Sequence, residues 1–291
     1  MWMQPVPSGI LDRMANHAKQ PNHVRKRYQV PAKGRKFRLD EVDAGDDGGL
    51  ERDEAEALLR DDLEALDGLQ EKLIAASSHG LLVVIQAMDT GGKDGTIRKV
   101  FGPLDSLGLE VHSFKKPSLE EAAHDFLWRV HQVCPRKGMI SVFNRSHYED
   151  VGVVRVHGWV DEDTIEQRYR QINDFELMLA ENGTRILKLF LHISRDEQRE
   201  RLEARRDDPT KRWKFQPGDL DERKLWDDYM DAYGEALRRC STPWAPWFVV
   251  PANKKWYRNH VVARLLRHTL EDLDLEYPPG PPGIAKVKIP K

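Results

Sequence analysis

The stretch QAMDTGGKDGT, residues 86–96, contains the residue types that suit binding of a phosphate group. Gly91 and Gly92 leave backbone N–H groups open to an anion, because no Cβ stands in the way. Lys93 adds a mobile cation, and the helix expected to start beside it adds partial positive charge. Five apolar residues, 81–85, precede the turn as a buried strand would. This order of strand, glycine-rich turn, lysine and helix predicts a phosphate-binding loop. The alternative is an ordinary turn between a strand and a helix.

The loop departs from the usual pattern G-x-x-x-x-G-K-[ST] at two positions, where Ala87 replaces the first glycine and Asp94 replaces the Ser or Thr. It also contains Asp89, two residues before the glycines. A carboxylate repels phosphate, so Asp89 is better explained if it holds Mg²⁺ between phosphates or positions an attacking phosphate oxygen. An aspartate that only stabilises the turn is the alternative.

A second polar cluster, NRSHYED at residues 144–150, follows another apolar run. Arg145 suits a bidentate phosphate contact. Glu149 or Asp150 could bind a metal, a ribose or a base. His147 is expected to pack or hydrogen-bond rather than to act as a base, because phosphoryl transfer between phosphates depends on charge neutralisation and alignment.

Basic residues gather in two further places. The segment from residue 195 to 214 resembles a lid that closes over a transferred group and excludes water; its candidate cations are Arg199, Arg205, Arg206, Lys211 and Lys214. Because acidic residues alternate with these cations, a solvated, salt-bridged helix is the alternative.

Lys115 and Lys116 follow a second strand and are expected to face the acceptor. Four of the eight tryptophans, Trp128, Trp159, Trp213 and Trp226, are expected to pack, with base stacking as the minor alternative.

Bulk composition limits the classes of partner. The 291 residues carry a net charge of −2, so any anion site must come from local clustering.

A basic run from Arg25 to Arg38 is expected to belong to a solvated arm that packs across the domain or a partner subunit. The alternative is that it adds positive electrostatic potential near a phosphate site, and nucleic-acid binding is weakly supported. Two cysteines suggest no disulfide framework. With no apolar run long enough for a bilayer and no signal peptide, we expect a cytoplasmic protein.

The elements that must position these residues alternate along the chain. Strands are expected at 81–85, 110–114, 139–143, 185–192 and 246–251, and helices at 54–77, 92–107, 118–133, 161–182, 194 onward, 220–239 and 256–273. This alternation predicts a parallel sheet with helices on both faces, and ligands at the carboxyl ends of its strands. We expect an extended N-terminal arm (1–53), a catalytic domain (54–275) with a lid at about 195–220, and a Pro-rich tail (276–291).

Taken together, these motifs resemble the polyphosphate kinase 2 family. The resemblance spans about residues 25 to 275 and is carried by QAMDTGGKDGTIRKVF (86–101), FKKPSLEEAAHDFLWRVHQ (114–132), FNRSHYEDVGVVRVHG (143–158), RDDPTKRWK (206–214) and PWAPWFVVPANKKWYRN (243–259). It implies a three-layer, thymidylate-kinase-like (P-loop kinase-like) fold with a helical basic lid. It further implies phosphate transfer between inorganic polyphosphate and nucleotides, with Mg²⁺ or Mn²⁺, in a homo-oligomer. The family tolerates a variant loop of this kind.

The resemblance also implies roles for individual residues. Asp89, Lys93 and Arg145 correspond to catalytic positions, and Asp89 to the metal ligand. Position 144 often carries Asp in the family, so Asn144 shifts the expected metal role onto Asp89. The sequence SHYEDV at residues 146–151, with Glu149, is similar to that of the subgroup that accepts both AMP and ADP. Further phosphate- or nucleotide-binding positions are Met88, Thr90, Gly91, Gly92, Asp94, Gly95, Asn144 and Glu149. Lys115, Lys116 and the lid cations would line the polyphosphate path.

The sequence therefore predicts a polyphosphate:nucleotide phosphotransferase that acts on AMP, ADP, ATP and, as a further option, guanine nucleotides, and that binds neither nucleic acid nor membrane. An ATP-dependent nucleoside or nucleotide monophosphate kinase is the first alternative, because fold and loop suit either. A polyanion-binding protein without turnover is the second, and the retention of Asp89 with Lys93 argues against it.

Overall fold

A five-stranded parallel sheet forms the centre of the computed structural model, which describes residues 23–32, 36–216 and 218–290. The strand order is β2-β3-β1-β4-β5. The strands are β1 (Gly80–Ala87), β2 (Leu109–Ser113), β3 (Ile140–Asn144), β4 (Thr184–His192) and β5 (Trp247–Pro251). All eight residues of β1 are buried, as expected for an apolar strand covered on both faces. The predicted α/β class is confirmed.

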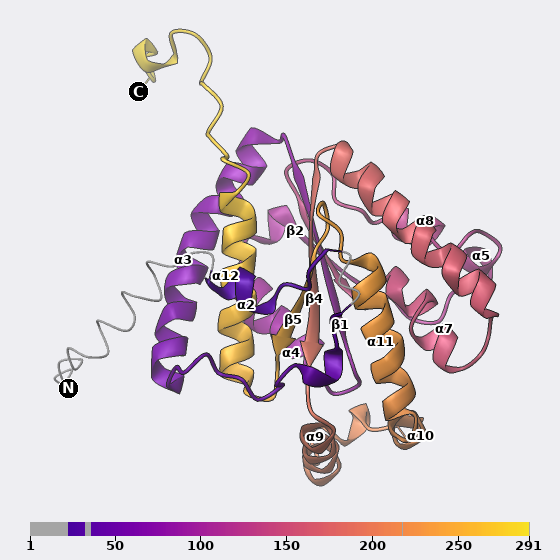
Figure 1. Ribbon diagram of the computed structural model, residues 1–291. Helices are drawn as coiled ribbons and strands as arrows, with labels where there is room; N and C mark the ends of the chain where they lie inside the picture. Colours follow the sequence, from indigo (N-terminus) through magenta and orange to yellow (C-terminus); the bar gives the residue numbers. More distant parts are fainter. Residues whose placement is uncertain (1–22, 33–35, 217, 291) are drawn as a thin grey trace, which may run out of the picture.

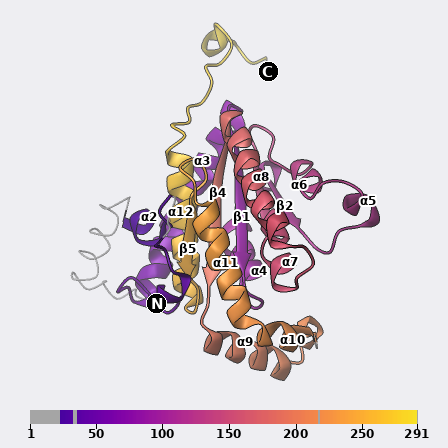
Figure 2. The same ribbon diagram turned by 45° about the vertical axis from the view of Figure 1, so that its right-hand side comes forward.

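Helices cover both faces of the sheet (Figure 1). On one face, α3 (Arg52–Ala76) packs along α12 (Lys255–Glu271). On the other face lie α8 (Glu162–Glu181) and α11 (Trp226–Cys240). Beyond the carboxyl ends of the strands, α9 (Arg195–Asp207) and α10 (Gly218–Lys224) lie side by side (Figure 2). The carboxyl edge of the sheet is thus covered by the basic segment, residues 195–220.

Three expected helices are shorter than the sequence indicated. The helix expected at 92–107 consists of α4 (Lys93–Thr96) and a π-helical turn, η2 (Ile97–Phe101), and Gly102-Pro103 ends it. The helix expected at 118–133 is only α5 (Leu119–Ala122) and α6 (Trp128–His131); α5 buries no side chain, so packing does not sustain it. The helix expected at 220–239 is interrupted at Leu225, which separates α10 from α11.

Short 3₁₀ and helical turns complete the chain between these elements. They are η1 (Leu39–Glu41), η3 (Ser106–Gly108), η4 (His147–Asp150), α7 (Val153–Val156), η5 (Arg212–Lys214) and η6 (Ile284–Lys286).

The described part of the N-terminal segment packs across the domain. It begins with α2 (His23–Tyr28), and Gln29 then pairs antiparallel with Phe248 of β5. The N–H of Val30 donates to the carbonyl oxygen of Trp247 at 2.8 Å, and the Val30 side chain is fully buried. This segment therefore covers the outer edge of β5.

Three of its arginines pair with acids, and none of its described basic residues lines the cleft described below. Arg25 contacts Asp272 at 2.5 Å, Arg27 contacts Asp46 at 2.6 Å, and Arg38 contacts Asp40 at 2.6 Å. Lys33 and Arg35 lie outside the described residues.

The C-terminal segment, residues 276–290, is exposed and extends away from the domain (Figure 1). Within the part of the chain that the structure describes, no helix has the length and apolar character needed to cross a membrane.

Candidate active site

The glycine-rich loop, residues 87–93, connects the end of β1 to α4 and needs both of its adjacent glycines. Gly92 has φ +101°, and a Cβ there would lie 2.0 Å from Nη1 of Arg258. A Cβ on Gly91 would lie 2.5 Å from the Cβ of Ala87 and 2.8 Å from the carbonyl oxygen of Met88. The positive φ of Gly92 and the close approach of Arg258, Ala87 and Met88 explain why side chains are excluded here.

Four charged side chains converge at the mouth of this loop. Nη2 of Arg145 lies 3.3 Å from Oδ1 of Asp89, and its Nη1 lies 3.3 Å from Oε2 of Glu149. Lys93 donates to the carbonyl oxygen of Ala87 at 3.0 Å. The loop after β1 and the loop after β3 thus bring together residues 56 positions apart, because their strands are hydrogen-bonded neighbours.

The electrostatic environment of these groups follows from their burial. Burial lowers the pKa of Lys93, although Asp89 partly opposes this effect. Burial also disfavours the charge of Arg145, but Glu149 and Asp89 outweigh it and raise the pKa of Arg145. A lysine held in a desolvated position gains more from an arriving phosphate than one already hydrated in bulk water.

Asn144 and Asp94 contact each other directly. Nδ2 of Asn144 donates to Oδ1 of Asp94 at 2.9 Å. Two of the three positions at which the chain differs from the common patterns are therefore joined by one hydrogen bond. With an amide at 144, Asp94 remains the carboxylate of this pair.

A buried ion pair stabilises the loop after β3. Nζ of Lys188 lies 2.6 Å from Glu176, and neither side chain is exposed. The hydroxyl of Tyr148 donates to Glu176 at 2.8 Å, and His147 lies 3.3 Å from the same carboxylate. His147 is therefore a buried hydrogen-bonding residue, as the sequence indicated. Asp150 faces Arg129 and Arg168, at 3.8 and 3.7 Å, and does not line the cleft.

A cleft of about 1160 Å³ surrounds the glycine-rich loop. Its walls are provided by the loop, the segments after β2 and β3, the basic segment and the start of α12. Eleven lysines and arginines line it against five aspartates and glutamates, in a chain whose net charge is −2. The local excess of positive charge suits a polyanion.

Most residues predicted for the site line this cleft. They are Met88, Asp89, Thr90, Gly91, Gly92, Lys93, Asp94, Gly95, Lys115, Lys116, Asn144, Arg145, Glu149, Arg205, Lys211 and Lys214. Arg199 and Arg206 do not line it. Arg206 is exposed and pairs with Asp207 at 2.7 Å, and Arg199 lies 3.8 Å from Asp196.

Sequence reasoning missed four cations of the lining: Arg98, Arg201, Lys255 and Arg258. Arg258 comes from α12 and is 3% exposed; burial and the nearby charge of Arg201 lower its pKa to about 10. Burial and the same arginine also lower the pKa of Lys255.

The signal for Arg201 was present in the helical spacing of α9. Gln198, Arg201, Leu202 and Arg205 share one face, and Leu202 marks that face as the inner one.

Two tryptophans expected to pack are instead exposed at the cleft. Trp159 is 66% exposed and Trp213 is 75% exposed, and both belong to its lining. Trp159 stacks on His157, with ring centroids 4.9 Å apart. Their flat, exposed faces suit contact with a nucleobase.

The carboxylates of the cleft fit a magnesium ion that shares its ligands with a substrate. Among the described residues, no group of three or more His, Cys, Asp or Glu could hold a metal ion without help. Mg²⁺ is usually bound by one or two carboxylates together with substrate phosphates and water, rather than by an all-protein cage. Asp89 and Glu149, on either side of Arg145, are suited to supply such carboxylates.

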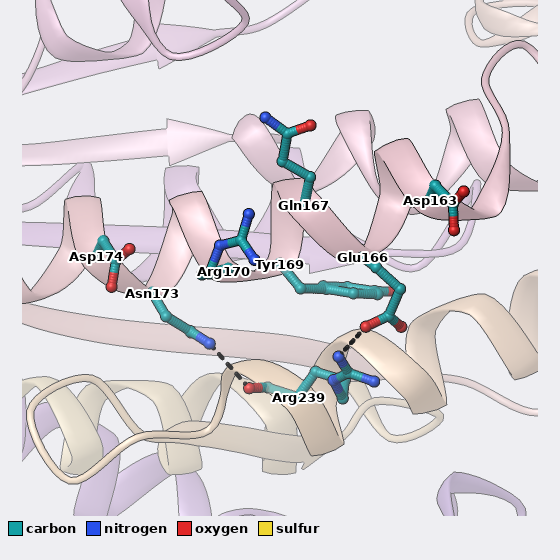
Figure 3. A pocket seen from close by; sticks show the side chains of 8 residues that line it. All are labelled: Asp163, Glu166, Gln167, Tyr169, Arg170, Asn173, Asp174 and Arg239. Carbon is teal, nitrogen blue, oxygen red and sulfur yellow. Dashed lines mark hydrogen bonds and ion pairs between the residues drawn. The ribbon is translucent and has the colours of Figure 1, made fainter.

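A second, smaller groove of about 540 Å³ lies between α8 and α11 (Figure 3). Arg239 there pairs with Glu166, and Asn173 donates to the Arg239 carbonyl oxygen at 3.1 Å. Its charges are largely neutralised by one another, so it lacks the cation excess of the cleft.

Comparison with known proteins agrees with this geometry. The family model described as polyphosphate kinase 2 matches residues 49–278. The chain is 52% identical over 268 residues to the AMP/ADP-polyphosphate phosphotransferase of Meiothermus ruber, covering 91% of this chain and 99% of that relative. It is 45% identical over 241 residues to the ADP-polyphosphate phosphotransferase of Rhodopseudomonas palustris, covering 79% and 83%.

A solved structure is similar over nearly the whole chain. Polyphosphate kinase 2 from Arthrobacter aurescens TC1 is 46% identical, with a TM-score of 0.85 over 89% of this chain and 95% of that one. This similarity confirms the expected kinase-like α/β fold. The protein therefore belongs to the polyphosphate kinase 2 family.

Proposed function

We propose that this protein transfers the terminal phosphate of inorganic polyphosphate to ADP and to AMP, reversibly and with Mg²⁺. The observation that carries the proposal is the excess of cations in the cleft around a glycine-rich loop that also holds two carboxylates. Polyphosphate is a long polyanion, so it needs an extended basic surface. The carboxylates fit a metal ion shared with the phosphates.

In the reaction, an oxygen of the nucleotide's terminal phosphate attacks the terminal phosphorus of the polyphosphate chain. A new P–O bond forms, and the shortened chain leaves with the electron pair of the broken P–O bond. Lys93 and Arg145 neutralise the charge of the transferring group, and Asp89 and Glu149 would hold the metal. When bound, Mg²⁺ supplies charge shielding between donor and acceptor. An attacking phosphate oxygen needs no general base, which agrees with the burial of His147.

The basic segment contributes cations from the opposite wall of the cleft. Arg205, Lys211 and Lys214 line it from α9 and η5. We propose that they bind the donor chain together with Lys115 and Lys116, and that their closure excludes water. Excluding water matters because hydrolysis of polyphosphate competes with transfer.

Acceptance of both AMP and ADP is supported by the name of the relative at 52% identity and by Glu149 at the cleft. Glu149 would orient the acceptor or its metal when the β-phosphate is missing. Guanine nucleotides are proposed as further acceptors, Mn²⁺ as an alternative metal, and a cytoplasmic homo-oligomer as the working form.

The test is to mix the protein with polyphosphate, Mg²⁺ and one of AMP, ADP, GMP or GDP, and to identify the nucleotide products. We expect ADP from AMP and ATP from ADP. If ATP alone phosphorylates a nucleoside or nucleotide monophosphate while polyphosphate gives no product, the alternative kinase is correct. Tight polyphosphate binding without turnover in Mg²⁺ would instead indicate a binding protein.

A further inference from the structure

Two side chains from α9 hold the backbone of the glycine-rich loop. Nε2 of Gln198 donates to the carbonyl oxygen of Asp89 at 3.1 Å, and Nη1 of Arg201 donates to the carbonyl oxygen of Thr90 at 2.9 Å. Both side chains are nearly buried: Gln198 is 1% exposed and the Arg201 side chain 8%. The first two turns of the basic segment are therefore attached to the loop that carries Asp89.

This support acts at a strained part of the loop. Thr90 has φ +63°, a left-handed conformation that costs a non-glycine residue about 1 kcal/mol or more. In a trans peptide the carbonyl and the next N–H point in opposite directions. Holding the carbonyl of Asp89 toward α9 therefore turns the N–H of Thr90 away from α9, and it limits the orientation of the Asp89 residue itself.

Arg201 anchors this part of α9 independently of the rest of the basic segment. Its Nη2 also donates to the carbonyl oxygens of Ala252 and Asn253, at 2.5 and 3.2 Å, beyond the end of β5. Its Nε contacts Glu197 at 2.6 Å. The contact with Glu197 lies within α9, whereas the bonds to Ala252 and Asn253 join α9 to the central domain without involving α10.

Gln198, in contrast, connects the loop to α10. Its Oε1 accepts from Nη1 of Arg223 at 2.8 Å, and the same nitrogen donates to the carbonyl oxygen of Arg195 at 2.8 Å. The orientation of the Gln198 amide is determined by its partners, because the Asp89 carbonyl can only accept and the Arg223 guanidinium can only donate. The chain of contacts runs from Arg223 in α10, through Gln198 in α9, to the backbone of Asp89.

We propose that Gln198 is a positioning residue that couples the placement of α10 to the alignment of Asp89. When Arg223 engages, it holds the Gln198 amide in the orientation that supports the Asp89 carbonyl. When α10 moves away, that support loosens. Loop alignment is thereby linked to closure of the basic segment. This inference rests on the proposed function for its catalytic consequence, but not for its structural one.

The first test measures the loop itself, without turnover. Amide hydrogen exchange is followed in peptides that cover residues 88–93 in the wild type, in Arg223→Ala and in Lys224→Ala. Lys224 is the matched control, because it is 76% exposed and pairs with Asp221 within α10. Loss of the Arg223 contact should speed exchange in the loop about fivefold, the value of one hydrogen bond, while the control leaves it unchanged. Equal exchange in the two variants would overturn the proposal.

The second test is a double-mutant cycle on phosphate transfer from polyphosphate to ADP. Gln198→Met makes neither bond, so it should lower kcat about five- to tenfold with little change in KM for either substrate. Arg223→Ala should lower kcat by a similar factor, and adding it to Gln198→Met should cost little more. Additive losses would show that Arg223 acts independently of Gln198, which would overturn the coupling. A wild type that exchanges as expected but transfers no phosphate would refute the proposed function alone.

Discussion

At the scale of single residues, Asp89 has an unusual position. It brings a carboxylate into a loop whose backbone, lysine and helix start all favour anions, and it forms an ion pair with Arg145 at 3.3 Å. The Arg145 guanidinium and an incoming metal ion would both be attracted to the same oxygen. In the mechanism we propose, the carboxylate exchanges Arg145 for the metal ion when substrate arrives.

Asp89→Asn tests this role directly. The amide keeps the size of the side chain but lacks the charge needed to hold a divalent metal, so we expect phosphate transfer to fall about 100-fold or more while the fold is retained. The measurement is kcat/KM at saturating Mg²⁺, with thermal unfolding as the check on folding. Asp61→Asn, at an exposed position on α3, serves as the control. Activity of Asp89→Asn within a few-fold of the wild type would rule out a metal role.

Some residues of the cleft could be predicted from the sequence, and others could not. The location of Asp89, Lys93, Arg145 and Glu149 in one cleft could be predicted because they follow apolar strands that end at one edge of a sheet. The prediction of Arg199 and Arg206 rests on charge alone, and helical phase places them outside the cleft. Arg258 could not be found from local pattern, since its role depends on α12 lying against the glycine-rich loop.

At the scale of elements, the start of α4 depends on Gly92. Its φ of +101° is accessible to glycine but strained for other residues, and a Cβ would collide with the buried guanidinium of Arg258. The loop can therefore lie this close to Arg258 of α12 because residue 92 has no side chain.

We expect Gly92→Ala to lower the free energy of unfolding by about 1–3 kcal/mol and to impair phosphate transfer. Chemical denaturation and steady-state kinetics measure the two effects. Gly95→Ala is the control for stability, because a Cβ there would meet only Nη2 of Arg258, at an ordinary 3.5 Å, and helical geometry suits alanine. Equal stabilities of the two variants would contradict this account.

The limits of sequence reasoning at this scale are physical. Long amphipathic helices such as α3 and α8 could be predicted from their apolar period. The segment from residue 118 to 133 begins with a capping box, which is present at Ser118 and Glu121, but a cap alone does not sustain a helix. The first helix of this segment, α5, buries no side chain and ends after four residues.

At the scale of the whole molecule, alternation of strands and helices was enough to predict a parallel sheet covered on both faces. The order β2-β3-β1-β4-β5 could not be derived from periodicity, because it depends on which strands pair with each other across long connections. The packing of the N-terminal segment on β5 could not be derived from periodicity either, because the segment and its partners on β5 are far apart in the sequence.

Buried histidines make the stability of the domain depend on pH. His192, at the end of β4, is 7% exposed, and burial lowers its pKa from 6.5 to about 4. Between pH 6.5 and 4 the unfolded chain binds a proton at this position and the folded protein does not, so the free energy of unfolding falls as the pH falls. The effect amounts to up to about 3 kcal/mol.

Thermal unfolding of His192→Gln should consequently lose less stability between pH 7 and pH 4 than the wild type does. His124→Gln is the control, because His124 is exposed and stacks on Trp128. If the wild type and His192→Gln lose equal stability over this range, the burial of His192 does not govern acid sensitivity.

The bridge between the N-terminal segment and β5 also has a consequence for synthesis of the chain. Val30 reaches its hydrogen-bond partner only at Trp247, near the other end of the protein. At 5–20 residues per second, a ribosome needs roughly 10–40 s to add the intervening residues. During that time the apolar side chains of Val24, Tyr28 and Val30 are without their native neighbours on β5 and α12. These residues are thus synthesised well before β5 and α12, and they are among the last of the described residues to be buried.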